Sequence, residues 1–191
     1  MKLEQNSKKK LILPIFLASI MVLSIFGGFL GLSGGDKEDN LKFKMGNSEF
    51  VFQDGVYKGR KENLNFYVTS DPRKLSENVP VIANQILGNE KVYLSYNPKE
   101  GTQLPVKIIY ENLKQHINIF LACSVDIEEC KDLPIKTCDD AKDKVGVFLV
   151  EFGEKNIIDV KDQCVILNGN LESLNRMSNA IILQLFGVNN G

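Results

Sequence analysis

The feature that most constrains this sequence is an uncharged segment near its start. Residues 11–35 contain no charged side chain, and three consecutive lysines, Lys8, Lys9 and Lys10, precede them. The apolar part of the segment runs from Leu11 to Leu32 and is 22 residues long. At about 1.5 Å per residue, a helix of this length crosses the ~30 Å hydrocarbon layer of a membrane. The sequence therefore predicts one transmembrane helix over residues 11–33.

The length of this segment also bears on its processing. The apolar core of a cleavable signal peptide is usually about 7–15 residues long, so a longer core favours a signal-anchor that the mature chain keeps. The small residues from Gly31 to Gly35 would nevertheless suit a cleavage site. Gly27 and Gly31 have the spacing of a helix-packing motif, so the sequence also allows a homodimer through these two glycines.

Charge predicts the orientation of the chain in the membrane. Residues 1–10 hold four lysines and one glutamate, whereas the remaining residues hold 19 Lys and Arg against 23 Asp and Glu. Because cytoplasmic flanks of membrane helices are enriched in Lys and Arg, we expect residues 1–10 to be a cytoplasmic basic tail. Residues 34–40 then form a linker, and residues 41–191 form an extracytoplasmic domain of a single-pass cell-membrane protein.

The predicted location bears on how the four cysteines are interpreted. Cys123, Cys130, Cys138 and Cys164 are an even set, and an extracytoplasmic domain favours disulfides. Three pairings are possible, and we favour Cys123–Cys130 and Cys138–Cys164. The first closes a short polar loop and the second ties a loop to the start of a strand. Free thiols, a zinc site and a redox pair are alternatives, although the spacing lacks the close cysteine pairs of such sites.

The first part of the domain predicts an antiparallel β meander. Alternating apolar and polar residues occur at 41–45, 49–53 and 64–70. The turn dipeptides Gly46-Asn47 and Asp54-Gly55 separate these segments. We therefore expect three strands, each with a polar face towards solvent.

The rest of the domain predicts helices that alternate with strands. Helices are expected after the capping residues Asn78, Thr102 and Asn170, with Gly88 ending the first and Gly187 the last. Near-continuous apolar runs at 118–123 and 145–152 suit strands that are buried on both faces of a sheet. Further strands are expected at 92–96, 156–160 and 164–167.

This order predicts an α/β fold. Strand–helix–strand units produce parallel strands at the centre of a sheet, and the late hairpin adds antiparallel ones. The expected architecture is a mixed sheet with an N-terminal β meander, central parallel βαβ strands and covering helices, preceded by the transmembrane helix.

The loops after the first two parallel strands are a possible ligand-binding edge. Ligands of open α/β sheets bind at the carboxyl ends of the strands. Both loops carry polar side chains, although neither contains a phosphate-binding glycine loop, and they can also be read as ordinary solvated loops. The residues of this possible ligand edge are Asn97, Lys99, Thr102, Ser124 and Asp126.

Other reactive side chains favour structural roles. His116 is the single histidine, so any Ser–His or Cys–His pair must use it, but its place at a helix end suits an interaction with the helix dipole. Asp139, Asp140 and Asp143 could bind Ca²⁺, but they lack the loop pattern of such sites and suit helix capping better. We therefore predict no catalytic residue, cofactor or metal. The mild acidity and the lack of a basic stripe also exclude nucleic acid as an expected partner.

Two resemblances add to this interpretation. From Leu64 onward the element order resembles a thioredoxin-like βαβαββα unit, although no C-x-x-C follows the strand at 64–70. The whole chain resembles short single-span proteins of archaeal envelopes. That resemblance lies in the lysine-flanked anchor, the Leu-Pro-x-x-x-Cys-x-x-Ala stretch at 133–141 and the Cys-x-x-Leu strand at 164–167. It implies a place in the cell envelope and no particular activity.

The expected function is therefore a non-catalytic, membrane-tethered extracytoplasmic domain that binds another protein or an envelope component. The alternative is a membrane-anchored, thioredoxin-like thiol–disulfide protein. The geometry of the cysteines distinguishes the two, because a redox pair needs an exposed cysteine with a lowered pKa.

Overall fold

The computed structural model of the chain describes residues 41–188, with the backbone alone described at residues 83 and 84. The predicted tail (1–10), anchor (11–33), linker (34–40) and Gly27–Gly31 motif lie outside the described residues. Within the described part, no helix is both long and apolar enough to cross a membrane. The residues from Leu41 onward form one compact unit.

The predicted β meander is present, but it has four strands rather than three. The strands are β1 (Lys42–Met45), β2 (Ser48–Gln53), β3 (Val56–Lys61) and β4 (Leu64–Val68), and each pairs antiparallel with the next. The prediction missed β3 because its sequence, VYKGRK, has little apolar alternation. It pairs along its length with β2 and β4, so neighbouring strands, rather than its own side chains, determine its conformation.

Aromatic rings cover one face of the meander. Phe43 stacks on Phe50 with their ring centroids 5.2 Å apart, and Phe50 meets Phe66 edge-on at 5.7 Å. Gly59 of β3 lies below these rings, and a Cβ there would collide with the ring of Phe66. A glycine in the middle of this strand is thus required by the close approach of an aromatic ring.

The second sheet has five strands in the order β6-β5-β7-β9-β8. Three pairs are parallel (β5 with β6, β5 with β7, and β7 with β9), and β8 is antiparallel to β9. This confirms the mixed sheet with a parallel centre. The strand bounds are β5 (Lys91–Tyr96), β6 (Ile119–Cys123), β7 (Val145–Phe152), β8 (Ile157–Lys161) and β9 (Cys164–Gly169).

One prediction about burial is wrong. The apolar run at 145–152 forms the central strand β7, which is buried over most of its length as expected. The similar run at 118–123 forms β6, which lies at the edge of the sheet, and the side chain of Phe120 is 47% exposed. An apolar run therefore did not distinguish a central strand from an edge strand.

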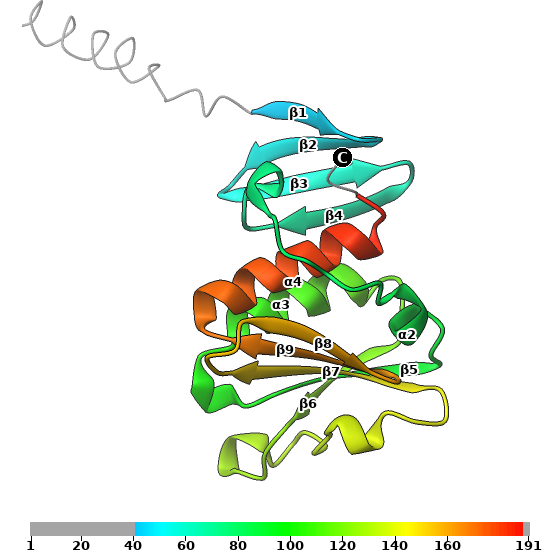
Figure 1. The fold of residues 1–191 in the computed structure, drawn as a ribbon, viewed down its shortest axis with the longest axis vertical. Coiled ribbons are helices and arrows are strands. Elements are labelled where there is room, and N and C mark those ends of the chain that lie inside the picture. The colour runs from blue at the N-terminus through cyan, green and yellow to red at the C-terminus, as the bar shows by residue number, and fades with distance from the viewer. Residues whose placement is uncertain (1–40, 189–191) are drawn as a thin grey trace, which may run out of the picture. The chain divides into compact units, whose positions relative to one another are not determined.

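Two long helices lie between the two sheets (Figure 1). They are α3 (Gln103–Leu113) and α4 (Leu171–Leu185). In α4, every residue from Met177 to Leu183 is buried, which is expected for a helix with a sheet on each side. Asn170 caps α4 as predicted, since its side chain accepts a hydrogen bond from the N–H of Ser173 at 2.9 Å. The helices therefore cover one face of each sheet.

The first predicted helix is shorter than expected. It was predicted to start after Asn78, but α2 spans only Ala83–Leu87. The segment before α2 is not helical, because a residue of α4 bonds to its backbone. The side-chain amide of Gln184 donates to the carbonyl oxygens of Val79 (2.9 Å) and Pro80 (2.8 Å). A contact across about a hundred residues of sequence thus overrides a local capping signal.

Two helix asparagines pair with the edge of β4 and with the residue that follows it. Asn112 of α3 accepts a hydrogen bond from the N–H of Tyr67 (2.8 Å) and donates to its carbonyl oxygen (3.0 Å). Asn179 of α4 accepts from the N–H of Thr69 at 2.7 Å. Both asparagines are buried. They take the place of a neighbouring strand and join the meander to the helices.

The opposite face of the five-stranded sheet is covered only in part. The segment between β6 and β7 crosses it through two short 3-10 helices, η3 (Glu128–Cys130) and η4 (Cys138–Asp140). Both predicted disulfides are present, Cys123–Cys130 and Cys138–Cys164. The second fastens η4 to β9, where it packs with Val147 and Leu149 in a small separate cluster. Beyond this cluster, the same face over β8 and β9 has no covering helix among the described residues.

Candidate functional site

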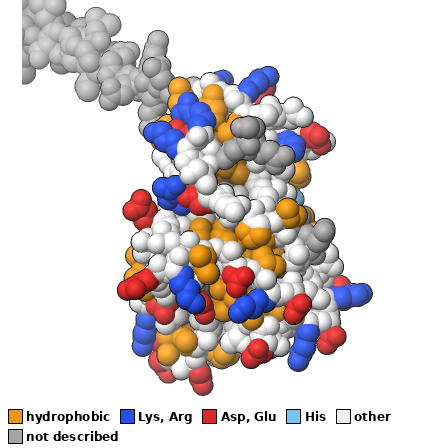
Figure 2. All heavy atoms as spheres, in the orientation of Figure 1, with side chains coloured by type: hydrophobic (Ala, Val, Ile, Leu, Met, Phe, Trp, Pro, Cys, Tyr) orange, Lys and Arg blue, Asp and Glu red, His pale blue; other side chains and the backbone are white. Residues whose placement is uncertain are grey.

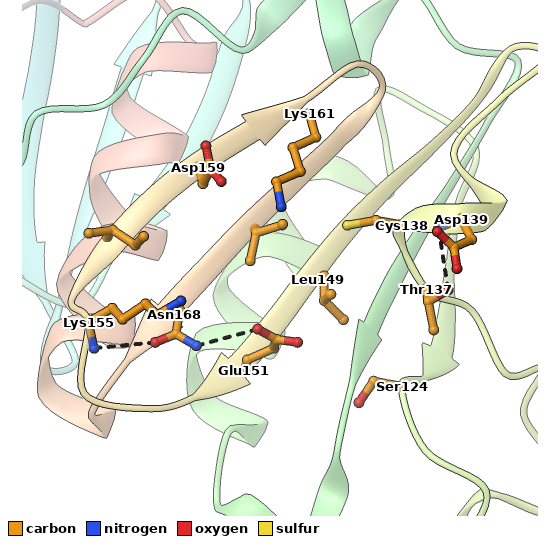
Figure 3. A pocket seen from close by; sticks show the side chains of 12 residues that line it. Ser124, Thr137, Cys138, Asp139, Leu149, Glu151, Lys155, Asp159, Lys161 and Asn168 are labelled. Atoms are coloured by element: carbon orange, nitrogen blue, oxygen red, sulfur yellow. Dashed lines mark hydrogen bonds between the residues drawn. The ribbon is translucent and has the colours of Figure 1, made fainter.

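The uncovered part of the sheet forms an open hollow of about 380 Å³ (Figure 3). Side chains of a strand alternate between its two faces, so every second residue of β7, β9 and β8 points into this space. Its floor is apolar and its rim is charged, and the 3-10 helix η4 forms one wall. The lining residues are Ser124, Thr137, Cys138, Asp139, Leu149, Glu151, Lys155, Ile157, Asp159, Lys161, Ile166 and Asn168.

Hydrogen bonds hold the η4 wall in place. Thr137 and Asp140 form a capping box, in which the N–H of Thr137 donates to the Asp140 carboxylate at 2.9 Å. The carboxylate also pairs with Lys136 at 2.9 Å. The hydrogen bond from Thr137 and, after it, the pairing with Lys136 hold the pKa of Asp140 below its usual value. The capping role expected for Asp140 is confirmed, and the Cys138–Cys164 disulfide adds a covalent link from this wall to the sheet.

Asn168 connects the groups at one end of the hollow. Its side-chain amide donates to Glu151 at 3.4 Å, and its oxygen accepts from the N–H of Lys155 at 3.4 Å (Figure 3). Gly153 lies directly against Asn168, where a Cβ would collide with the amide. These contacts orient the carboxylate of Glu151 on the rim.

The charges on the rim are mixed in sign. Lys155 and Lys161 are basic, whereas Asp139, Glu151 and Asp159 are acidic. Figure 2 likewise shows acidic and basic side chains intermixed over the visible face of the five-stranded sheet. A shallow surface of this kind, with an apolar floor and both charges on its rim, suits a polar protein surface or a zwitterionic group better than a polyanion.

The described residues do not form a recognised catalytic arrangement at this hollow. Ser124 lines it, but His116 lies elsewhere, with its ring edge-on to Phe186 at 5.3 Å between centroids. Among residues 41–188, no group of three or more His, Cys, Asp and Glu side chains could hold a metal ion.

The five residues of the predicted ligand edge lie in loops that meet, as expected, at one end of the sheet. The N–H of Ser124 donates to the carbonyl oxygen of Tyr96 at 3.0 Å. Lys99 pairs with Glu129 across the two loops at 3.1 Å. Thr102 is buried and donates its hydroxyl to the carbonyl oxygen of Asn97 rather than capping a helix with it. Asp126 is exposed to solvent.

Glu100 is a further residue at this edge, and the sequence did not predict its role. Its carboxylate accepts from the side chain of Asn97 (3.0 Å) and from the N–H of Phe152 (3.0 Å). It therefore links the ends of β5 and β7, between which the order of the strands reverses. Ligands of open α/β sheets bind at such a reversal, often as anions on free N–H groups. Here the Glu100 carboxylate of the chain itself already accepts from the N–H of Phe152 and from the Asn97 side chain.

The hollow on β7, β9 and β8 was not predicted from the sequence. A signal was present, because Glu151, Asp159, Lys161 and Asn168 alternate with apolar residues in these strands. Such alternation indicates one covered and one solvated sheet face. What the sequence could not show is that these strands are neighbours, which brings the polar side chains together.

Comparisons of this chain with models of protein families, with curated proteins and with solved structures found no match.

Proposed function

We propose that this chain is a membrane-tethered extracytoplasmic domain that binds another protein or an envelope component through the hollow on β7, β9 and β8. The observation that carries the proposal is the uncovered sheet face itself. On the other side of the sheet, β7 and β9 pack against α4 in the main core, whereas this side presents an apolar floor with charged residues around it. A solvated sheet face needs no apolar floor, so the exposed Ile157 and the partly exposed Ile166 are the part of it that favours a partner, whereas Leu149 is buried in the cluster beside the Cys138–Cys164 disulfide.

The support for the tether comes from the sequence. The lysines at 8–10 and the uncharged segment that follows them predict an anchor with its N-terminus in the cytoplasm. The two disulfides are consistent with an oxidising compartment, in which disulfides persist. Nucleic acid is not a proposed partner, because the hollow combines both signs of charge.

A photocrosslinking experiment tests the proposed face. A photoreactive amino acid is placed at Ile157, which lines the hollow and is 43% exposed, or at Val81, which lies elsewhere and is 74% exposed. In the intact chain in its native membranes, we expect a discrete adduct from Ile157 and none from Val81. Reversing the neighbouring charge by Lys161→Glu should weaken the adduct at least several-fold. Equal labelling at both positions, or no adduct at Ile157, would contradict the proposal.

A thiol–disulfide activity is the second candidate, because one observation favours it. Cys138 lines the hollow and is only partly buried, so an incoming thiolate could reach its sulfur. Against it, Cys164, Cys123 and Cys130 are all buried, which is typical of structural disulfides.

The two candidates differ in a simple experiment. Replacing Cys164 with alanine leaves Cys138 as a free thiol at the hollow. If the disulfide exchanges with a partner, the Cys138 thiolate of this variant should attack a disulfide of the oxidised partner, and one partner sulfur should leave as a thiolate. The resulting mixed disulfide should persist on a non-reducing gel, because Cys164 is absent and cannot resolve it. The leading proposal predicts no such adduct. It also predicts that the photocrosslink from Ile157, in the otherwise unchanged chain, stays the same when free thiols are alkylated without prior reduction of the disulfides.

A further inference from the structure

The described strands leave four sheet edges, and three of them carry features that discourage the pairing of a further strand. At β4, Asn112 and Asn179 bond the backbone groups at the edge. β8 carries the charged residues Asp159 and Lys161, and the side chain of Asp159 accepts a hydrogen bond from the N–H of Val160 at 2.9 Å. β1 is only four residues long and carries Lys42 and Lys44. Bonded backbone groups, short edge strands and lysines are the usual means by which proteins prevent unwanted strand pairing.

The fourth edge, β6, is protected at one end only among the described residues. Its sequence, IFLAC, contains no charged residue and no proline. Among residues 41–188, the contacts on the side of β6 that faces away from β5 lie at its end, where the N–H of Cys123 donates to the carbonyl oxygen of Pro134 (2.9 Å). The carbonyl oxygen of Cys123 in turn accepts from the N–H of Lys136 (2.8 Å), so that Ile135 forms a single parallel bridge with Cys123.

The backbone of Leu121 points to this open side. Asn118 and Ser124, the residues that flank β6, bond to the neighbouring strand β5, whereas Cys123 bonds to the opposite side. Backbone groups in a strand alternate in direction, so Leu121, two residues before Cys123, directs its N–H and carbonyl oxygen away from β5. The bridge at Cys123 shows that a chain can pair along this line.

A hollow of about 380 Å³ surrounds the open part of the edge. Its lining includes the aromatic residues Tyr93 and Phe120 and the basic residue Lys91, but no acidic residue among the described positions. The ammonium group of Lys91 lies 5.5 Å from the ring centroid of Phe120 and 5.8 Å from that of Tyr93. The other lining residues are Tyr110, Ile119, Leu121, Leu133 and Pro134.

We propose that the β6 edge binds an extended segment of a partner protein, which adds a strand beside Leu121. In this mode the backbone of the bound segment supplies the hydrogen bonds, and pockets select its alternate side chains. An apolar side chain would fill the space beside Phe120 and Tyr93, and a carboxylate would face Lys91. This site is separate from the hollow on β7, β9 and β8, and its binding does not require that hollow.

A second copy of this chain fits the edge less well. Antiparallel pairing of two β6 strands centred on Leu121 would place Ile119 of one copy opposite Cys123 of the other. Ile135 already occupies the position beside Cys123. A short bound peptide that ends before it reaches Pro134 of this chain avoids this overlap. The edge therefore favours a peptide of another protein as its occupant.

The test uses the full chain in lipid nanodiscs and a phage library of random heptapeptides. Selected peptides should alternate apolar side chains and carry an acidic group. N-methylation of every second backbone amide, in the register that pairs with Leu121, should reduce their affinity at least tenfold, and methylation in the other register should not. Phe120→Lys should also reduce affinity at least tenfold, whereas Phe152→Lys, at a residue of similar exposure (52%) on β7, should not.

Three outcomes would overturn this proposal. One is the absence of any enriched peptide family with alternating apolar residues. Another is binding that is insensitive to Phe120→Lys or to N-methylation in both registers. The third is a change in the oligomeric state of the chain on Phe120→Lys without an effect on peptide binding, which would assign the edge to a second copy. Since N-methylation changes only the peptide, misfolding of a variant cannot account for its result.

Discussion

Replacing Asn112 with alanine should lower the free energy of unfolding by about 3 kcal/mol. The Asn112 amide satisfies the N–H and the carbonyl oxygen of Tyr67, and it also donates to the carbonyl oxygen of Ile108 at 2.8 Å. A buried donor or acceptor left without its partner costs about 1–3 kcal/mol. The better helix propensity of alanine offsets only about 0.5 kcal/mol of this loss. Equilibrium denaturation in urea measures the change.

Asn65→Ala is the matched control for this prediction. Asn65 lies on the same strand as Tyr67 but is exposed, so its replacement should change stability by no more than about 0.5 kcal/mol. The N112D variant adds a second check. A buried carboxyl has a raised pKa in the folded state, so this variant should be less destabilised near pH 4 than at pH 7. Equal effects of Asn112→Ala and Asn65→Ala would contradict the pairing role of Asn112.

Loss of the Cys138–Cys164 disulfide should have an effect of similar size. Replacing Cys138 with alanine should cost about 2–5 kcal/mol, the usual range for a native disulfide in a small secreted domain. The physical reason is that η4 covers its face of the sheet with few buried side chains of its own and is joined there to β9. Cys164→Ala should cost about the same, and the double replacement little more than either one.

The first disulfide provides the comparison. Cys123 and Cys130 are 7 residues apart, whereas Cys138 and Cys164 are 26 apart. In the chain-entropy model the shorter loop contributes about 2.5 kcal/mol and the longer about 3.5 kcal/mol. Cys123→Ala should therefore cost less than Cys138→Ala. A larger effect of Cys123→Ala, or peptide mapping that finds a Cys123–Cys138 link or four free thiols in the folded protein, would rule out this account.

Local signals predicted those parts of the fold that depend on neighbouring residues. The Asn170 cap, the buried strand β7 and the pairing of Cys138 with Cys164 all follow from short patterns or from spacing. The failures came from distant contacts. The strand β3 is specified by its two neighbours, and the late start of α2 by Gln184. No window of the sequence around these elements contains that information.

The candidate sites show the same division. The loops of Asn97 and Ser124 were correctly expected at one end of the sheet, because the carboxyl ends of parallel strands share an edge. The role of Glu100 depends on Phe152, which is distant in sequence. No sequence pattern distinguishes Asn112 from other polar residues of its helix, and its contact with Tyr67 explains its burial. The open edge of β6 likewise became visible only once the strand order was known.

The orientation of the domain is the central claim, and a reporter fusion tests it most directly. An alkaline phosphatase, which is active only after export from the cytoplasm, is fused after Gly191 of the full chain. Because the lysines at 8–10 predict a cytoplasmic N-terminus, this fusion should be active, and it should remain with the membrane fraction after an alkaline wash. A second fusion at the same position carries a reporter that is active only in the cytoplasm. If the phosphatase is inactive and this second reporter is active, residues 41–191 lie inside the cell and the account is contradicted.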